Sequence, residues 1–238
     1  MNVAAIFAGG VGSRMKSKVL PKQFLEVHGK AIIVHTLEHF QEHAEIDGIV
    51  VAILPEYREL LERLVHRYEL TKVRIVDGGS TGQESRHRAL QAIAEWYPED
   101  TVVLIHDGVR PLIDAELISE NIAAVREHGS AITCTKVFET IVISATGKVD
   151  EVIPREKLYT AQAPQSFWLK DVLAAYDRAV DEGERDSIDS CSLMRGYGHD
   201  VHMVEGPRSN IKITTAEDFY ISRSFFELVE TQQLIGGA

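Results

Sequence analysis

Short apolar runs alternate with longer amphipathic segments along most of the chain. The apolar runs are rich in β-branched residues, and they predict strands at Val3–Phe7, Gly48–Leu54, Val73–Val76 and Val102–His106. Apolar and polar positions do not alternate within these runs. We therefore expect the strands to be buried on both faces, as in a largely parallel sheet.

The segments between the runs have helical spacing. Leu60, Leu61, Leu64 and Val65, for example, form the stripe of a helix that faces a core. The predicted helices are Ile32–Gln41, Glu56–Tyr68, Gly82–Trp96, Ala115–Glu127, Asp171–Glu182 and Ala216–Glu230. A Thr215-x-x-Asp218 capping pattern precedes the last of them. The alternation of strands and helices predicts a layered α/β fold with helices on both faces of a mostly parallel sheet.

Phe138–Ile153 interrupts the alternation. Its sequence, FETIVISATGKVDEVI, has two extended runs around Ala145-Thr146-Gly147-Lys148, and Gly147 suits a turn with positive φ, so a protruding β-hairpin arm (138–153) is predicted. Because a hairpin is not stable alone, the arm must pack on its own domain or on a second copy of the chain, and both alternatives stay open. Since no linker divides the sequence, we expect a single domain spanning residues 1–238.

Composition narrows the possible partners and locations. The chain has 238 residues, of which 45% are hydrophobic and 26% charged, as in globular proteins with a substantial core. A net charge of -11 argues against a nucleic-acid partner. No apolar run approaches the ~20 residues of a membrane span, so we expect no membrane partner and a cytoplasmic location. Cys134 and Cys191 are too few for a disulfide framework or zinc site, and we expect reduced thiols.

The first apolar run ends in a glycine-rich loop, Ala8-Gly9-Gly10-Val11-Gly12. A dinucleotide-binding fingerprint needs a third glycine, but Ser13-Arg14-Met15 follows Gly12. A P-loop needs Gly-Lys-Ser/Thr before its helix, and Gly29-Lys30-Ala31 does not provide it. Both standard interpretations, including that of a dehydrogenase, are therefore weak.

Two cations, Arg14 and Lys22, follow the glycine loop. Glycines carry no Cβ, so the loop amides can approach a triphosphate closely. Fixed cations beside a phosphate chain stabilise the charge that develops during phosphoryl or nucleotidyl transfer. The alternative is that both are solvated surface charges.

Five motifs together resemble a known family. They are AGGVGSRM followed by Pro21-Lys22-Gln23, Asp77-Gly78-Gly79, His106-Asp107-Gly108-Val109-Arg110-Pro111, Pro164-Gln165-Ser166-Phe167, and Asn210-Ile211-Lys212-Ile213-Thr214. In this order they resemble the nucleotidyltransferases that make activated sugars and alditols. The Pro-Lys-Gln form resembles the cytidylyltransferases that act on methylerythritol phosphate and on ribitol 5-phosphate. The resemblance implies a Rossmann-like nucleotidyltransferase fold.

The resemblance also implies a nucleotide site for CTP. Its nucleotide-binding positions are Ala8, Gly9, Gly10, Gly12, Gly79, Ser80, Ser85 and Asp107. Asp107 would hold Mg²⁺ against the phosphates, since Mg²⁺ prefers oxygen ligands. From the residues alone, Ser85 equally suits the start of the helix that runs to Trp96, and Asp107 also suits a turn or cap. His106 is interpreted as a structural neighbour rather than a base.

The implied catalytic cations are Arg14, Lys22 and Lys212. The acceptor-binding positions are Arg110, Arg155 and Lys212, with Arg155 reaching the site from a neighbouring subunit. The resemblance therefore implies a homodimer in which the β-arm of each subunit completes the acceptor site of the other. Arg110 has a second interpretation from the residues alone, as a brace of its loop.

Two departures from the methylerythritol enzymes bear on the acceptor. Ala163-Pro164-Gln165 replaces their common Thr-Pro-Gln, and Ile188-Asp189-Ser190 replaces Thr-Asp-Glu, so two hydroxyl donors toward the acceptor are missing. The forms HDGVRP and IDSC are more similar to the ribitol-phosphate branch. We therefore expect transfer of CMP from CTP to D-ribitol 5-phosphate, giving CDP-ribitol and pyrophosphate.

Two alternatives remain. One is transfer to 2-C-methyl-D-erythritol 4-phosphate, and the acceptor would decide between a teichoic-acid-like polymer, a capsule and an isoprenoid as the product pathway. The other is a non-catalytic nucleotide-binding regulator. The presence of the expected cations and of Asp107 argues against a regulator.

Overall fold

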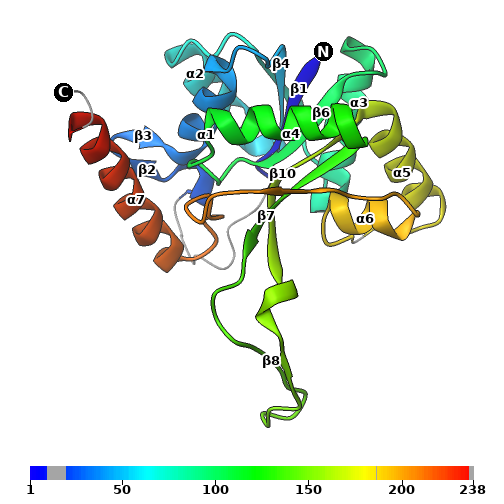
Figure 1. The fold of residues 1–238 in the computed structure, drawn as a ribbon. Coiled ribbons are helices and arrows are strands. Elements are labelled where there is room, and N and C mark those ends of the chain that lie inside the picture. Colours follow the sequence, from blue (N-terminus) through cyan, green and yellow to red (C-terminus); the bar gives the residue numbers. More distant parts are fainter. Residues whose placement is uncertain (10–19, 186, 236–238) are drawn as a thin grey trace.

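The structure is a computed structural model that describes residues 1–9, 20–185 and 187–235. A seven-stranded sheet with the order β11-β7-β10-β6-β1-β4-β5 lies at its centre (Figure 1). Its strands are β1 (Asn2–Phe7), β4 (Gly48–Ile53), β5 (Val73–Asp77), β6 (Val102–Asp107), β7 (Ser130–Lys136), β10 (Tyr159–Trp168) and β11 (Met203–Glu205). Neighbouring strands are parallel except where β10 pairs with β6 and β7, so the prediction of a mostly parallel sheet is confirmed.

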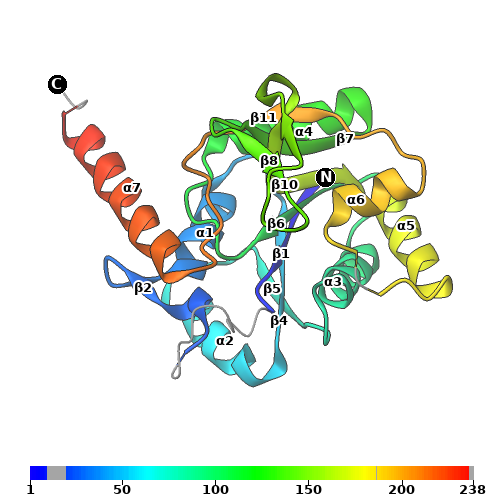
Figure 2. The ribbon, with the colours of Figure 1, turned by 90° about the horizontal axis from the view of Figure 1, so that it is seen from below.

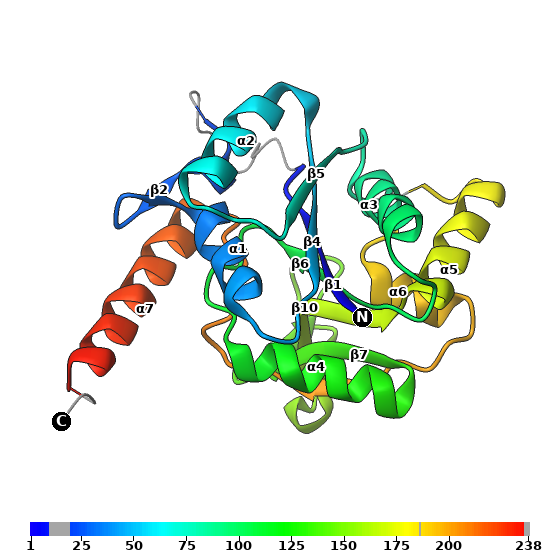
Figure 3. The same ribbon diagram turned by 90° about the horizontal axis from the view of Figure 1, so that it is seen from above.

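Helices cover both faces of this sheet (Figure 3). One face carries α1 (Ile32–Glu42), α2 (Arg58–Arg67) and α4 (Ala115–His128), and the other carries α3 (Gly82–Trp96), α5 (Leu169–Asp181) and α6 (Ser190–Gly196). Successive residues of β1 point to opposite faces of the sheet. Ala4 and Ile6 pack in the core with the first set of helices, and Val3 and Ala5 in the core with the second. Burial on both faces explains why the strand sequences are continuously apolar.

The last helix, α7 (Ala216–Ile235), lies outside these layers and extends away from the body (Figure 2). Its predicted capping pattern is confirmed: Thr215 Oγ1 accepts from Asp218 N at 3.2 Å, and Thr215 N donates to Asp218 Oδ2 at 2.7 Å. Phe219 and Phe226 pack against a small apolar cluster that includes Val27. The short strands β2 (Glu26–Val27) and β3 (Lys30–Ala31) form a separate two-stranded sheet. None of the described helices has the length and apolar character needed to cross a membrane.

The sequence analysis assigned no element to β7, β10 or α6. In β7 and β10 the buried positions include polar side chains, Thr133 and Ser166, that break an apolar pattern. Asn121 of α4 satisfies both, donating to Thr133 Oγ1 at 3.1 Å and accepting from Ser166 Oγ at 3.0 Å. These polar positions are therefore compatible with a core only through a partner that is distant in the sequence.

The chain between β7 and β10 forms the hairpin arm, which projects from the body (Figure 1). Strands β8 (Ile141–Ile143) and β9 (Glu151–Ile153) pair antiparallel, and Gly147 has φ 83° between them. Residues 138–152 are all exposed, although the segment includes the apolar side chains Phe138, Ile141, Val142, Ile143, Val149 and Val152. In this structure the paired strands of the arm therefore do not pack on their own domain, and packing on a second copy of the chain stays a prediction.

His106, near the end of β6, is fully buried and its ring packs edge-on against Phe40 of α1. Its Nε2 donates to the carbonyl oxygen of Arg110 at 3.2 Å. Burial lowers the pKa of His106 to about 3. The imidazole is therefore neutral near pH 7 and braces the turn that follows β6, in agreement with its interpretation as a structural neighbour.

We expect acid to destabilise the wild type more steeply than the His106→Gln variant. A histidine in an unfolded chain has a pKa of about 6.5. Between that pH and about 3, the unfolded chain therefore binds a proton at His106 that the folded protein does not bind. Stability is then complete above this range and falls as the pH is lowered through it. Burial also lowers the pKa values of His35 and His39, and their share of the slope remains in the variant.

Urea unfolding at several pH values from about 7 to about 4 measures both slopes. Glutamine retains a donor for the Arg110 carbonyl, so the variant changes the titration more than the packing. Identical slopes in the two proteins would show that His106 is not held neutral by burial.

Candidate active site

The candidate site lies at the carboxyl ends of β1 and β6. These strands are neighbours, and Phe7 at the end of β1 is the register partner of Asp107 at the end of β6. From β1 the chain proceeds outward through β4 and β5, and then returns to β6 on the other side of β1. In open α/β sheets ligands bind at such a reversal of strand order.

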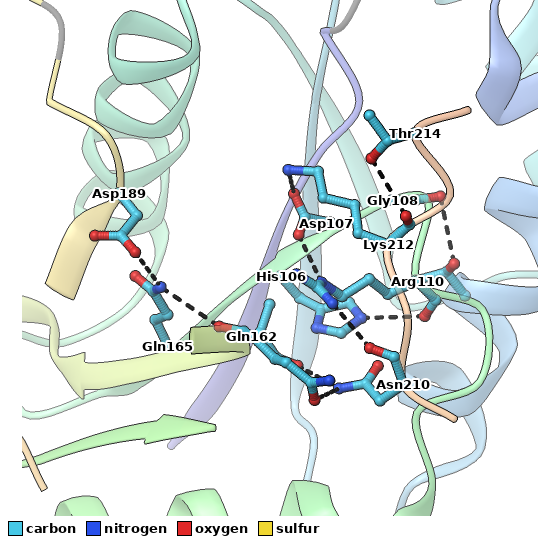
Figure 4. Close-up of polar contacts among 12 residues, drawn as sticks. His106, Asp107, Gly108, Arg110, Gln162, Gln165, Asp189, Asn210, Lys212 and Thr214 are labelled. Atoms are coloured by element: carbon cyan, nitrogen blue, oxygen red, sulfur yellow. Dashed lines mark hydrogen bonds and ion pairs between the residues drawn. The ribbon is translucent and has the colours of Figure 1, made fainter. Parts of the chain in front are cut away.

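Asp107 holds two cations at this point (Figure 4). Its Oδ1 accepts from Lys212 Nζ at 2.6 Å, and its Oδ2 accepts from Arg110 Nε at 2.8 Å. Burial alone would raise the pKa of Asp107, but the charges of Lys212 and Arg110 outweigh it and hold that pKa well below its usual range. Asp107 is therefore an anion shared by two cations.

Arg110 also connects Asp107 to the segment that carries Lys212. Its Nη1 donates to the carbonyl oxygen of Asn210 at 2.8 Å (Figure 4). Asn210 Nδ2 donates to the carbonyl oxygen of Ala163 at 2.7 Å. Three segments that are distant in the sequence thus meet around one buried carboxylate. Arg110 does brace its loop, as one interpretation of the sequence expected.

A cavity opens beside Asp107. Its charged lining residues, among those that the structure describes, are Arg86, Asp107, Arg110, Asp189 and Lys212. The structure therefore brings three predicted site residues, Asp107, Arg110 and Lys212, to one cavity. Ala163 and Ile188, the positions of the two missing hydroxyl donors, line it as well.

Gln165 fixes one wall of the cavity. Its Nε2 donates to Asp189 Oδ2 at 2.9 Å (Figure 4). Its Oε1 accepts from Cys191 N at 2.9 Å. Strand β10 is therefore tied to the beginning of α6. Cys191 and Cys134 are free thiols, as expected.

The nucleotide-binding positions near α3 meet at Ser85, which lies in the first turn of that helix. Ser85 Oγ accepts from Gly79 N at 3.0 Å and donates to the carbonyl oxygen of Thr81 at 2.9 Å. A Cβ atom at Gly9 would come within 3.2 Å of the same hydroxyl. The loop after β1 and the loop before α3 are therefore in close contact. Ser80 is exposed there, and its N–H donates to Glu84 Oε2 at 2.7 Å.

The Pro-Lys-Gln motif holds the end of β1. Gln23 is buried, and its Nε2 donates to the carbonyl oxygen of Ala8 at 2.6 Å. Lys22 is half-buried at the start of the 3₁₀ helix Lys22–Phe24. The sequence analysis gave Gln23 no role, although its position in the motif was a signal.

Three predicted site residues, Gly10, Gly12 and Arg14, lie outside the described residues. Arg155 is described, and it lies exposed at the base of the arm, where Nη1 donates to the carbonyl oxygen of Phe138 at 3.2 Å. Arg155 is not among the described lining residues of its own chain's cavity. The structure also adds a lining residue that the sequence analysis missed, Arg86 of α3.

The residues present fit a magnesium ion that arrives with phosphates. No cluster of three or more His, Cys, Asp or Glu side chains occurs within the described part of the chain, so it offers no all-protein cage. Asp107 provides one ionised carboxylate at the cavity, and each of its oxygens accepts one bond from a cation, which leaves further lone pairs. Mg²⁺ usually binds through one or two carboxylates, with phosphates and water completing its shell.

This chain is similar to known proteins over nearly its full length. A ribitol-5-phosphate cytidylyltransferase of Streptococcus agalactiae serotype III is 48% identical to this chain and covers 99% of this chain and 100% of its own. A 2-C-methyl-D-erythritol 4-phosphate cytidylyltransferase of Thermosipho melanesiensis is 37% identical, with 93% of this chain and 96% of its own covered. The crystal structure of 4-diphosphocytidyl-2C-methyl-D-erythritol synthase from Anaerococcus prevotii matches with a TM-score of 0.82 at 31% identity, over 95% of this chain and 96% of that chain.

These relatives are enzymes, so the interpretation as a non-catalytic regulator is no longer needed. The family model described as IspD, 2-C-methyl-D-erythritol 4-phosphate cytidylyltransferase, matches residues 2–227. The chain belongs to this family of cytidylyltransferases.

Proposed function

We propose that this enzyme transfers CMP from CTP to D-ribitol 5-phosphate and releases CDP-ribitol and pyrophosphate. The observation that carries the proposal is the Asp107 carboxylate, shared by Lys212 and Arg110 in the lining of the cavity at the carboxyl ends of β1 and β6. The choice of acceptor is supported by relatives in Streptococcus agalactiae and Vibrio parahaemolyticus that are 48% and 45% identical and are named ribitol-5-phosphate cytidylyltransferases. The methylerythritol 4-phosphate enzymes of Thermosipho melanesiensis and Clostridium novyi are 37% and 36% identical.

The reaction is an in-line displacement at phosphorus. An oxygen of the acceptor phosphate forms a bond to the α-phosphorus of CTP, and the bond from that phosphorus to the oxygen bridging the β-phosphorus breaks. Pyrophosphate leaves with the electron pair. The attacking phosphate is already an anion, so the step requires no strong general base. The neutral, fully buried His106 is consistent with this, because it has no role as a base.

The cations bring two anions together. Lys212 has a side chain that is 40% exposed, and its ammonium lines the cavity, where it offsets the repulsion between the acceptor phosphate and the α-phosphate. Lys22 and Arg14 would stabilise the triphosphate and the departing pyrophosphate, together with the amides of the loop 8–12. Gly79, Ser80 and Ser85 would surround the cytosine.

Asp107 would hold Mg²⁺, with Arg110 keeping the carboxylate in place. When bound, the ion neutralises negative charge on the phosphate oxygens. Arg110 remains bonded to Asp107 Oδ2 and to Asn210, so the carboxylate keeps its orientation if Lys212 moves toward substrate.

The proposed active unit is a homodimer. The arm exposes an apolar surface, and Arg155 lies at its base rather than in its own chain's cavity. Packing of the arm on a second subunit would bury that surface and bring Arg155 to the acceptor site of the partner.

We expect Lys212→Ala to lower kcat by about two orders of magnitude or more, the scale of losing one preorganised transition-state donor. Asp107 keeps Arg110 as a partner in this variant, so the fold should persist. Pyrophosphate release measures the rate. Lys170→Ala, an exposed lysine on α5, is the matched control and should retain wild-type turnover. Near-normal turnover of Lys212→Ala would remove Lys212 from the mechanism.

Acceptor choice can be measured directly with CTP and each alditol phosphate. We expect kcat/KM for D-ribitol 5-phosphate to exceed that for 2-C-methyl-D-erythritol 4-phosphate by about tenfold or more, because Ala163 and Ile188 stand where the methylerythritol enzymes have hydroxyl donors toward their acceptor. Equal values would indicate a broad acceptor site. A reversed preference would establish the methylerythritol alternative.

Charging the arm tests the shared site. Val142 and Val152 are cross-strand partners, so Val142→Lys with Val152→Glu keeps the hairpin paired by opposite charges while placing two charges on its apolar surface. We expect the wild type to be a dimer at micromolar concentration, and the double variant to be a monomer with turnover lowered about tenfold or more. Val180→Glu, at an exposed valine of α5, is the control. A wild-type monomer, or a fully active monomeric variant, would contradict the shared site.

A further inference from the structure

Arg86 occupies a core-facing position of α3. The same face of the helix continues through Ala89, Leu90 and Ile93, which are buried in the core between the sheet and the helices α3, α5 and α6. Arg86 is itself only 7% exposed, and it lines the cavity beside Asp107 and Lys212. A charged side chain at such a position requires a partner, because burial of an uncompensated charge is costly.

The hydrogen-bond partners of Arg86 are neutral. Its Nε donates to Tyr176 Oη at 2.8 Å, and its Nη2 donates to the carbonyl oxygen of Ser187 at 3.1 Å. Burial raises the pKa of Tyr176, so its hydroxyl carries no charge near pH 7. Tyr176 Oη in turn shares a hydrogen bond with Ser190 Oγ at 2.8 Å. These contacts orient the guanidinium without neutralising it.

The two carboxylates among the described lining residues of the cavity are bonded to other groups. Asp107 pairs with Lys212 and Arg110. Asp189 accepts from the Gln165 side chain and from the backbone N–H of Ser192. Within the part of the chain that the structure describes, Arg86 forms no ion pair, whereas Arg110 and Lys212 do. Arg86 is therefore a fixed positive charge facing the cavity.

Phe7 relates Arg86 to the reacting groups. The Arg86 Cζ lies 5.5 Å from the centre of the Phe7 ring, and the Lys212 Nζ lies 5.7 Å from it. Both cations therefore contact one ring at the end of β1, directly before the loop that begins at Ala8. An anion bound beside that ring lies within reach of both.

We propose that Arg86 binds the phosphate group of the acceptor and sets the affinity for it, an inference that rests on the proposed function. A phosphate monoester supplies the charge that Arg86 lacks, and it accepts two parallel hydrogen bonds from a guanidinium. Tyr176 and Ser187 hold Nε and one N–H of Nη2, which leaves Nη1 and the second N–H of Nη2 without a described protein acceptor. The pocket thereby selects phosphorylated acceptors over uncharged alditols.

Steady-state kinetics with CTP and D-ribitol 5-phosphate test this role in Arg86→Gln and Arg86→Lys. We expect Arg86→Gln to raise KM for the acceptor about tenfold or more while KM for CTP changes less than about twofold. Arg86→Lys retains the charge without the fork, so its KM should be intermediate. Arg178→Gln removes the same charge from an exposed ion pair with Glu182 on α5, and both of its KM values should equal those of the wild type.

Inorganic phosphate provides a second measurement, as a competitive inhibitor against the acceptor. Its inhibition constant should rise in Arg86→Gln by the same factor as KM for the acceptor. A rise in KM without a change in phosphate inhibition would overturn the phosphate contact. An unchanged acceptor KM, or equal rises in both KM values accompanied by a lower melting temperature, would reduce Arg86 to a brace between α3, α5 and the segment before α6.

The wild type separates this inference from the proposed function. If it turns over 2-C-methyl-D-erythritol 4-phosphate in place of the ribitol ester, the proposed acceptor is wrong, and the same Arg86 variants are measured with the acceptor that reacts. If neither ester reacts, the proposed function is wrong, and the proposed binding of the acceptor phosphate by Arg86 is rejected together with it.

Discussion

The arrangement of the site depends on one buried carboxylate, Asp107, and on the two cations that share it. Removing a carboxylate from water is costly, and Lys212 and Arg110 offset this cost at 2.6 and 2.8 Å. Through Arg110 the same interaction fixes Asn210, which in turn bonds to β10 at Ala163. The end of β6, the segment before α7 and the antiparallel strand β10 are therefore positioned together rather than independently.

The sequence predicted those helices and strands whose hydrophobic pattern is unbroken along the whole element. The continuous apolar strands, the exact range of α3 and the cap at Thr215 follow from residues that are neighbours in sequence. Strands β7 and β10 escaped prediction, because Thr133 and Ser166 are compatible with a core only when Asn121 satisfies them from another element. The insertion of β10 between β6 and β7 is likewise a tertiary outcome, which no local pattern specifies.

The sequence predicted those site residues that belong to short recognisable motifs. Asp107, Arg110 and Lys212 were identified from motifs, and the structure brings them to one cavity. Arg86 and Gln23 were missed for a shared reason: each is a polar side chain that a sequence pattern assigns to solvent, and each is buried. For Arg86 a signal existed in the helical stripe that continues through Leu90, where a charge interrupts an apolar face.

The charge of the cavity is opposite to that of the chain. The described lining residues include three cations, Arg86, Arg110 and Lys212, against two carboxylates, whereas the whole chain carries a formal charge of -11. An acidic exterior repels polyanions such as nucleic acids, while a positive cavity with low-dielectric walls attracts small anions. Catalysis here requires that two negatively charged molecules meet, and their repulsion weakens only where fixed cations are already in place. The excess of positive charge among the described lining residues therefore lies where it lowers the barrier.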